Sequence, residues 1–321
     1  MRLKTISERI DAITEIPEDR KQEKLAPPRS VKIELTARCN FACAFCARSA
    51  KLRDQKDMDQ GLYESLALEM REAGVEELGL FYLGESFLLS WLEEAIGYAK
   101  KIGYPYVFLT TNGSLAIPKR VETCIRNGLD SLKFSLNYAG EKQFCEIARV
   151  KAPLYRAMLY NIEGARKVRD QVEKETGHRC GLYGSYIQYD GDQGKRMAES
   201  VEALRPYLDE IYALPLYNQA DLVTEEGEAR NWSVTAGNRG RLDALRDPIP
   251  CWAVFTEGHI TFDGKLSACC FDHDGRFHMG DLTRTSFLEA WNSDEFQRLR
   301  KAHLNGDVTG TVCETCAAYS S

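Results

Sequence analysis

Segments that read as β-strands and as α-helices alternate about six times between residues 30 and 217 of this 321-residue chain. "VKIEL" at 31–35, "YVFLTT" at 106–111 and "SLKFSLN" at 131–137 are three of the strand-like segments. Helical periodicity follows the strands, as in the long segment 153–175. Most strands are apolar on both faces, which predicts a parallel sheet covered by helices, open or rolled into a partial barrel. Ligands of such sheets bind at the carboxyl ends of the strands.

The character of the chain changes after about residue 220. A polar, glycine-containing stretch is followed by a hairpin pattern across Asp263 and Gly264, by one predicted helix over 285–306 and by a closing "CETC". We therefore expect an α/β protein, a partial (β/α)6 barrel with a small carboxyl-terminal α+β domain. The predicted divisions are an amino-terminal helical extension at 1–28, the barrel at 29–220, a linker or loop at 221–248 and the small domain at 249–321.

Composition excludes several classes of protein. Apolar residues make up 44% and charged residues 28% of the chain, and the net charge is −6 without basic runs, so we expect no nucleic-acid partner. No apolar run reaches the length of a membrane span and no signal peptide begins the chain, which predicts a cytoplasmic protein. In a reducing compartment, eleven cysteines indicate metal or redox chemistry rather than disulfides.

Three cysteines, Cys39, Cys43 and Cys46, lie in the loop that leaves the first strand. A structural zinc ion takes four ligands, and the five histidines are far away in the sequence. Three thiolates can hold three corners of a [4Fe–4S] cluster and leave one iron open to an external ligand. Packing as small buried residues is the alternative for an isolated cysteine.

The spacing of these cysteines, with Phe45 just before the last, resembles the signature of the radical S-adenosylmethionine (SAM) superfamily. The resemblance implies that the amino and carboxylate groups of SAM bind the open iron. An electron from the cluster then cleaves SAM into methionine and a 5′-deoxyadenosyl radical, which takes a hydrogen atom from the substrate. It also implies an electron donor of the flavodoxin or ferredoxin type.

Further family positions follow in the expected order along the chain. The family's Gly-Gly-Glu-Pro turn, which contacts the SAM amino group, corresponds here to "LGES", where Leu83 and Ser86 depart from the pattern. The resemblance implies that SAM is contacted by Gly84, Glu85, Thr111, Asn112, Ser135 and Arg149. A Ser or Asn at a strand end is by itself ordinary turn chemistry, so the order of the whole set carries the assignment.

A second group of cysteines comprises Cys251, Cys269, Cys270, Cys313 and Cys316. A zinc ribbon would fit a C-x2-C pair with two other cysteines. After a radical SAM barrel, the spacing instead resembles the twitch form of the SPASM domain, which implies an auxiliary [4Fe–4S] cluster held by Cys251, Cys269, Cys313 and Cys316. Either member of the adjacent pair could be the ligand. Cys270 is then a packing neighbour or a thiol that returns a hydrogen atom to a substrate radical, while Cys124, Cys145 and Cys180 are expected to pack in the core.

The resemblance leaves several functions open. Relatives include oxidising enzymes such as 2-deoxy-scyllo-inosamine dehydrogenase, epimerases such as neomycin C epimerase, and enzymes that modify peptides. Only about 28 residues precede the barrel, which is short for a peptide-binding leader domain. We therefore expect a radical SAM oxidoreductase that acts on a small hydroxylated substrate, a carbohydrate or an aminocyclitol. Epimerisation with a cysteine hydrogen donor, peptide maturation, and a non-catalytic iron–sulfur or zinc scaffold are the alternatives.

Overall fold

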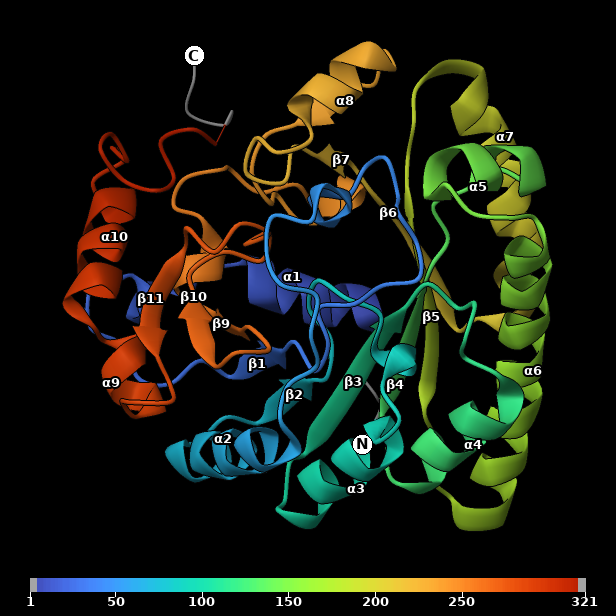
Figure 1. The fold of residues 1–321 in the computed structure, drawn as a ribbon, viewed down its shortest axis with the longest axis horizontal. Coiled ribbons are helices and arrows are strands. Elements are labelled where there is room, and N and C mark those ends of the chain that lie inside the picture. Colours follow the sequence, from blue (N-terminus) through green and yellow to red (C-terminus); the bar gives the residue numbers. More distant parts are fainter. Residues whose placement is uncertain (1–4, 317–321) are drawn as a thin grey trace.

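A nine-stranded sheet with the order β11-β10-β9-β1-β2-β3-β4-β5-β6 organises the computed structural model, which describes residues 5–316 (Figure 1). The outermost residues of the predicted segments 1–28 and 249–321 lie outside the described residues. Six strands run parallel in chain order, and they are β1 (Ser30–Ile33), β2 (Glu77–Gly79), β3 (Tyr106–Thr111), β4 (Ser131–Ser135), β5 (Gly181–Ile187) and β6 (Glu210–Leu214). The predicted partial (β/α)6 barrel is confirmed.

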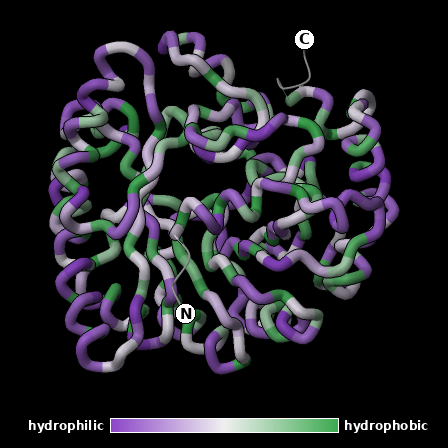
Figure 2. The backbone as a smooth tube through the Cα atoms, turned by 180° about the vertical axis from the view of Figure 1, so that it is seen from behind, coloured by the Kyte–Doolittle hydropathy of each residue, from purple (hydrophilic) through white to green (hydrophobic). Residues whose placement is uncertain are grey.

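Helices follow the strands and cover the outer face of the barrel (Figure 1). They are α2 (Gln60–Ala73), α3 (Leu92–Lys101), α4 (Pro118–Arg126), α5 (Glu141–Ala148), α6 (Pro153–Thr176) and α7 (Gly191–Leu204). Helices α4 and α6 begin with proline, whose fixed φ suits the first turn and which has no N–H to leave unpaired. Seen from behind, hydrophobic and hydrophilic residues interchange along the surrounding helices, because only one face of each packs on the sheet (Figure 2).

The carboxyl-terminal region continues the same sheet. Strand β9 (Glu257–Ile260) pairs parallel with β1, and β10 (Lys265–Ser267) and β11 (His278–Asp281) follow in antiparallel order. The predicted hairpin is confirmed, with Gly264 in its turn at φ +77°. The prediction of one helix over 285–306 is wrong, because α9 (Phe287–Trp291) ends before Ser293, whose hydroxyl caps the new helix α10 (Asp294–Leu304).

The segment expected to be a linker or loop contains short regular elements. Strand β7 (Leu216–Tyr217) pairs parallel with β8 (Val234–Thr235), and α8 (Thr224–Ala229) lies between them in the sequence. The two-stranded sheet formed by β7 and β8 places residues 218–221 beside the cysteine loop, where one of their side chains is used below.

Helix α1 (Ile6–Thr14) bridges the amino-terminal ends of two strands that are not neighbours in the sheet. Arg9 pairs with Glu77, the first residue of β2, at 2.5 Å. The carboxylate of Glu210, the first residue of β6, accepts hydrogen bonds from the backbone N–H groups of Ile6 and Ser7. Both carboxylates thus hold the helix across the barrel end that lies away from the cysteine loop.

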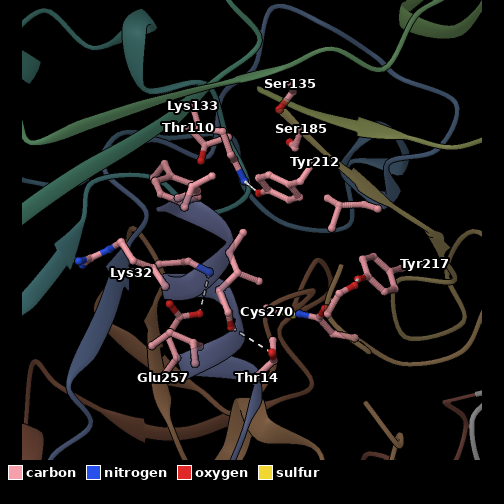
Figure 3. Close-up of a pocket in the computed structure, with 18 of the residues that line it drawn as sticks. Thr14, Lys32, Thr110, Lys133, Ser135, Ser185, Tyr212, Tyr217, Glu257 and Cys270 are labelled. Carbon is pink, nitrogen blue, oxygen red and sulfur yellow. Dashed lines mark hydrogen bonds and ion pairs between the residues drawn. The ribbon is translucent and has the colours of Figure 1, made fainter. Parts of the chain in front are cut away.

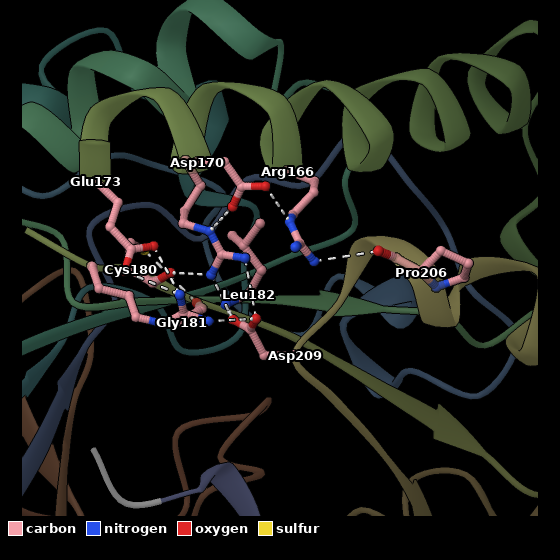
Figure 4. Close-up of polar contacts among 10 residues, drawn as sticks. Arg166, Asp170, Glu173, Cys180, Gly181, Leu182, Pro206 and Asp209 are labelled. Carbon is pink, nitrogen blue, oxygen red and sulfur yellow. Dashed lines mark hydrogen bonds and ion pairs between the residues drawn. The ribbon is translucent and has the colours of Figure 1, made fainter. Parts of the chain in front are cut away.

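A buried ion pair joins α6 to strands β5 and β6 (Figure 4). Arg169 is fully buried and donates to the carboxylate of Asp209 at 2.7 Å and to the carbonyl of Cys180 at 3.0 Å. Asp209 also accepts from the backbone N–H of Leu182 at 2.8 Å. Removing one partner of a buried pair costs about 3–5 kcal/mol, so this group sets the position of β6 against β5.

Candidate active site

The loop that carries the first three cysteines leaves the carboxyl end of β1 and lies against the end of α5. The backbone N–H groups of Ala42 and Ala44 donate to the carbonyls of Ala148 and Ile147 at 3.1 and 2.8 Å. The side chains of all three cysteines are half-buried, namely those of Cys39, Cys43 and Cys46. The predicted location of the cysteines, at the strand edge where ligands bind, agrees with the structure.

Gly84 lets the turn after β2 approach the start of the cysteine loop. A Cβ on Gly84 would lie 2.0 Å from the carbonyl oxygen of Thr36 and 2.8 Å from that of Arg38. The next backbone N–H, of Glu85, donates to the carbonyl of Arg38 at 2.8 Å. Only glycine fits here, because the two backbones are in direct contact.

Glu85 connects this turn to the carboxyl end of β3. Its carboxylate is buried and accepts from the hydroxyl of Thr111 at 2.8 Å and from the backbone N–H of Asn112 at 2.7 Å. Burial raises the pKa of Glu85, and the hydrogen bonds oppose that shift. The side-chain amide of Asn112 in turn donates to Asn40 at 2.9 Å, beside Cys39. Four of the predicted SAM-contacting residues therefore meet beside the cysteine loop.

Two residues that sequence reasoning missed also hold the loop. Gln219 donates to the carbonyl of Phe45 at 2.8 Å and accepts from the backbone N–H of Ala47 at 2.9 Å. The hydroxyl of Tyr138 lies 3.2 Å from Sγ of Cys43. Neither residue belongs to a motif, and both are distant in sequence from the loop they contact, so spacing alone carries no signal for them.

A cavity of about 340 Å³ fills the inside of the barrel between α1 and the cysteine loop (Figure 3). Phe45 of the loop and Cys270 beside Asn238 both line the cavity, and the inward side chains of the strands line its walls. Three hydroxyl-bearing residues form one row, because Ser135 on β4 is in register with Ser185 on β5, which is in register with Tyr212 on β6. We call these three residues the hydroxyl row.

Charged side chains also face the cavity. Lys32 pairs with Glu257 at 2.6 Å, and Nζ of Lys133 donates to the hydroxyl of Tyr212 at 3.0 Å (Figure 3). Burial opposes the charge on Glu257, but Lys32 and His259 together outweigh burial and lower the pKa of Glu257 to about 2. Gly79 makes room for this arrangement, since a Cβ there would lie 3.0 Å from Cγ of Lys32.

The sulfur atoms of the adjacent residues Cys269 and Cys270 have different neighbours. Cys270 lines the cavity, and its Sγ accepts a hydrogen bond from Nδ2 of Asn238 at 3.0 Å. The sulfur of Cys269 instead accepts from the backbone N–H of Phe271 at 3.3 Å, and Cys269 is absent from the lining of this cavity. The two thiols are in contact with each other, but only that of Cys270 lines the cavity, a difference that the sequence could not show.

The chain matches two family models. That of the radical SAM superfamily covers residues 33–174, and that of the SPASM iron–sulfur cluster-binding domain covers residues 251–317. The PqqA peptide cyclase of Xanthomonas axonopodis pv. citri is 31% identical to the chain, over 90% of the chain and 80% of that protein. The chain belongs to the radical SAM superfamily.

Solved structures show the same fold. BtrN in complex with AdoMet and 2-DOIA superposes with a TM-score of 0.59 at 17% identity, covering 90% of this radical SAM chain and 92% of BtrN. Streptococcus suis SuiB bound to precursor peptide SuiA gives a TM-score of 0.63 at 14% identity, covering 94% and 72% of the two chains. Membership and fold together establish the cofactors as a SAM-binding [4Fe–4S] cluster, auxiliary iron–sulfur chemistry and SAM.

The donor set of the first loop fits a SAM-binding cluster. Burial is the main cause that raises the pKa of Cys43, and the neighbouring charges of Cys46 and Cys39 raise it further, so the three thiols lie close together. Burial also raises the pKa of Cys39 to about 12. Thiols of this kind ionise when iron binds, because the cation replaces the proton.

The second donor set fits a four-thiolate cluster. The pKa of Cys251 is raised by burial and then by the charges of Cys313, Cys270 and Cys316, so residues far apart in the sequence meet here. The pKa of Cys313 is raised to about 12, by burial and by Cys316. Within residues 5–316, no three His, Cys, Asp or Glu side chains lie close enough to hold a single metal ion. In a [4Fe–4S] cluster each cysteine sulfur binds a different iron, so the four sulfurs stand farther apart than sulfurs that bind one metal ion.

The remaining predicted residues have mixed surroundings. Ser135 lines the cavity, as its predicted contact with SAM requires. Arg149 has a left-handed backbone at φ +56° and pairs with Glu226 of α8 at 2.9 Å, so its predicted contact with the SAM carboxylate requires the side chain to exchange partners. Cys124 and Cys180 are buried in the core and Cys145 packs half-buried on α5. No helix within 5–316 is both long and apolar enough to span a bilayer.

Proposed function

We propose that this radical SAM enzyme oxidises a small hydroxylated substrate, a carbohydrate or an aminocyclitol, inside the barrel. The observation that carries the proposal is the hydroxyl row, which lines a cavity large enough for such a molecule. Hydroxyl groups donate and accept, so a row of three can bind the hydroxyls of a polyol in a defined orientation. Ser135 is the last residue of β4, Ser185 lies in the carboxyl-terminal half of β5, and Tyr212 lies in the middle of β6.

In this proposal Cys39, Cys43 and Cys46 hold the SAM-binding cluster, and Cys251, Cys269, Cys313 and Cys316 hold the auxiliary one. When bound, the reduced SAM-binding cluster supplies the electron that cleaves SAM to a 5′-deoxyadenosyl radical. Glu85 and Asn112 fix the strand ends against which SAM would lie, with Gly84, Thr111 and Ser135 beside them. Phe45 closes the cavity on the loop side. A flavodoxin or ferredoxin is the proposed electron donor.

Oxidation of an alcohol to a ketone needs three separate losses from the substrate. The hydrogen atom on the carbon would pass to the 5′-deoxyadenosyl radical, and the hydroxyl proton would pass to a base or to water. The auxiliary cluster that Cys251, Cys269, Cys313 and Cys316 would hold would supply an acceptor for the remaining electron. Cys269 and Cys270 lie side by side between the cavity and the other auxiliary cysteines, so the electron acceptor would stand next to the substrate.

Hydrogen transfer tests the proposal. Anaerobically reconstituted protein should be incubated with SAM, a reductant and carbon-deuterated sugars, inositols and aminocyclitols, and 5′-deoxyadenosine should be analysed for deuterium. Deuterium in 5′-deoxyadenosine together with a ketone product is expected. Transfer from peptides alone would instead favour peptide modification, since the PqqA peptide cyclase and SuiB bound to its precursor peptide are among the proteins similar to this chain. Loaded protein that never cleaves SAM would indicate a scaffold.

Epimerisation of a sugar is the second candidate, and the position of Cys270 in the cavity lining favours it. A thiol there can return a hydrogen atom to the opposite face of the substrate radical, which leaves the substrate inverted and not oxidised. Cys270→Ala should retain both clusters and still form 5′-deoxyadenosine while losing inverted product. Loss of about half the iron in this variant would identify Cys270 as a cluster ligand.

A further inference from the structure

Five charged side chains line the cavity, and four of them form two ion pairs. Arg9 pairs with Glu77 at 2.5 Å, and Lys32 pairs with Glu257 at 2.6 Å. The fifth is Lys133 on β4. Within residues 5–316, its ammonium group forms no ion pair with a carboxylate, and its one hydrogen bond is to the hydroxyl of Tyr212 at 3.0 Å.

This arrangement leaves the cavity with one positive charge in excess. An ammonium group has three donors, and the bond to Tyr212 uses one of them. A charge taken out of water is unfavourable unless a partner of opposite charge meets it. The other two cations in the cavity have such a partner within the protein, whereas Lys133 has a neutral one.

Lys133 lies where it can contact a group of a substrate bound in the cavity. It lies two residues before Ser135 on the same face of β4, and its bond to Tyr212 joins it to the hydroxyl row. Thr110, its register partner on β3, also lines the cavity. Lys133 and the hydroxyl row therefore present a cation and several hydroxyls to the same small space (Figure 3).

We propose that the substrate is anionic, and that a carboxylate or phosphate on a hydroxylated small molecule binds Lys133 while its hydroxyls bind the hydroxyl row. This inference rests on the proposed function and narrows its substrate class. Ser135, at the end of β4, is the one member of the hydroxyl row that is also a proposed SAM contact, and Lys133 lies deeper in the barrel than Ser135. Glu85, Thr111 and Asn112, which are also proposed SAM contacts, meet beside the cysteine loop. The bound anion neutralises the excess charge of the cavity.

Binding measurements on the anaerobically reconstituted full-length protein test this inference without any turnover. The probes are matched pairs that differ in charge, namely glucose with glucuronate, glucose with glucose 6-phosphate, and myo-inositol with its monophosphate, together with inorganic phosphate. Calorimetry should show tighter binding of the anionic member in at least one pair. Comparison of glucuronate with the phosphorylated probes then identifies which anion is preferred. Equal affinity within every pair, or no binding of any anionic probe, would overturn the inference.

Variants of the lysine locate the effect. Lys133→Met should weaken binding of the anionic probe roughly tenfold or more, since a charge-assisted hydrogen bond is lost, and Lys133→Arg should restore part of it. Lys119→Met, on the exposed surface of α4, is the matched control and should bind the probe as the wild type does. If Lys133→Met lost affinity for SAM and kept it for the probe, Lys133 would belong to the cofactor site and the inference would fall.

The two levels of the proposal fail separately. Charge-dependent probe binding with no deuterium transfer from any hydroxylated compound would leave the anion site standing and overturn the proposed oxidation. Deuterium transfer from neutral sugars, with binding that is indifferent to charge and to Lys133→Met, would leave the proposed oxidation standing and overturn the anion site.

Discussion

The two cysteine regions of the protein are built in opposite ways. Cys39, Cys43 and Cys46 occupy one short loop, and their relative positions follow from that loop's own path. The auxiliary group combines Cys251 before β9, an adjacent pair after β10, and two cysteines that follow α10. The loop depends on neighbouring turns for its support, while the second group depends on the whole carboxyl-terminal region being folded.

This difference determines how each region should respond to change. The loop forms separate hydrogen bonds with the turn at Gly84, with carbonyls at the end of α5 and with Gln219, so single contacts can be changed one at a time. In the second group, Cys251 precedes β9, which pairs with β1, and the adjacent pair follows β10, which pairs with β9, so the position of this group is tied to the barrel. We expect graded effects at the first region and all-or-none effects at the second.

The largest expected effect is at the loop cysteines. Changing Cys39, Cys43 and Cys46 together to Ala should reduce formation of 5′-deoxyadenosine to the background, because three corners of the cluster lose their ligands. Cys145→Ala, which removes a half-buried thiol outside both groups, should retain activity. Product analysis after incubation with SAM and dithionite checks both, and activity in the triple variant would contradict the SAM-site assignment.

A change at Cys316 should separate the two regions. Cys316→Ala should lower the iron content of reconstituted protein from about eight to about four per chain, while SAM is still cleaved in the absence of substrate. Iron analysis and electron paramagnetic resonance of the reduced protein measure this. Iron that stayed near eight would show that Cys316 is not a ligand, and iron near four in the wild type would remove the auxiliary cluster.

Gly84→Ala tests the contact between the turn and the loop. The added Cβ overlaps the carbonyl of Thr36, so we expect a loss of about 2–4 kcal/mol in the free energy of unfolding and poor loading of the SAM-binding cluster. Gly97→Ala is the matched control, because its Cβ would lie no closer than 3.7 Å to another atom and the helix gains about 0.5–1 kcal/mol. Urea unfolding measures the free energy of unfolding, and iron analysis measures the loading of the cluster. Equal stability and equal iron content in Gly84→Ala and Gly97→Ala would argue against the contact.

The smallest expected effect is at Gln219. Gln219→Ala removes two hydrogen bonds to the loop, each worth about 1 kcal/mol, so the SAM-binding cluster should be lost faster in air while the auxiliary cluster decays as before. Gln60→Ala, which alters an exposed contact on α2, is the control. The loss of each cluster in air is followed by absorbance spectroscopy. Identical decay in Gln219→Ala and Gln60→Ala would mean that Gln219 does not support the loop.

Sequence reasoning predicted the barrel, the location of the cysteine loop and the hairpin across Gly264, because each depends on residues close together in the chain. It identified Gly84 and Glu85 from a family turn, and the structure adds that both join the cysteine loop to the ends of β2 and β3. It missed Gln219 and Tyr138, whose contacts arise between residues far apart in sequence. It also expected one helix where the cap at Ser293 starts a second.

What the sequence determined by itself is the chemistry that a short stretch can encode, namely three thiols at one spacing in a loop after a strand, within an alternating strand–helix pattern. The tertiary structure decided which thiol of the pair at 269 and 270 lines the cavity and which strands bring hydroxyls into one row. It also decided which of the two lysines that line the cavity has no carboxylate partner among the residues described here. The physical reason is that strand register and side-chain direction are set by packing between distant segments, which no local pattern specifies.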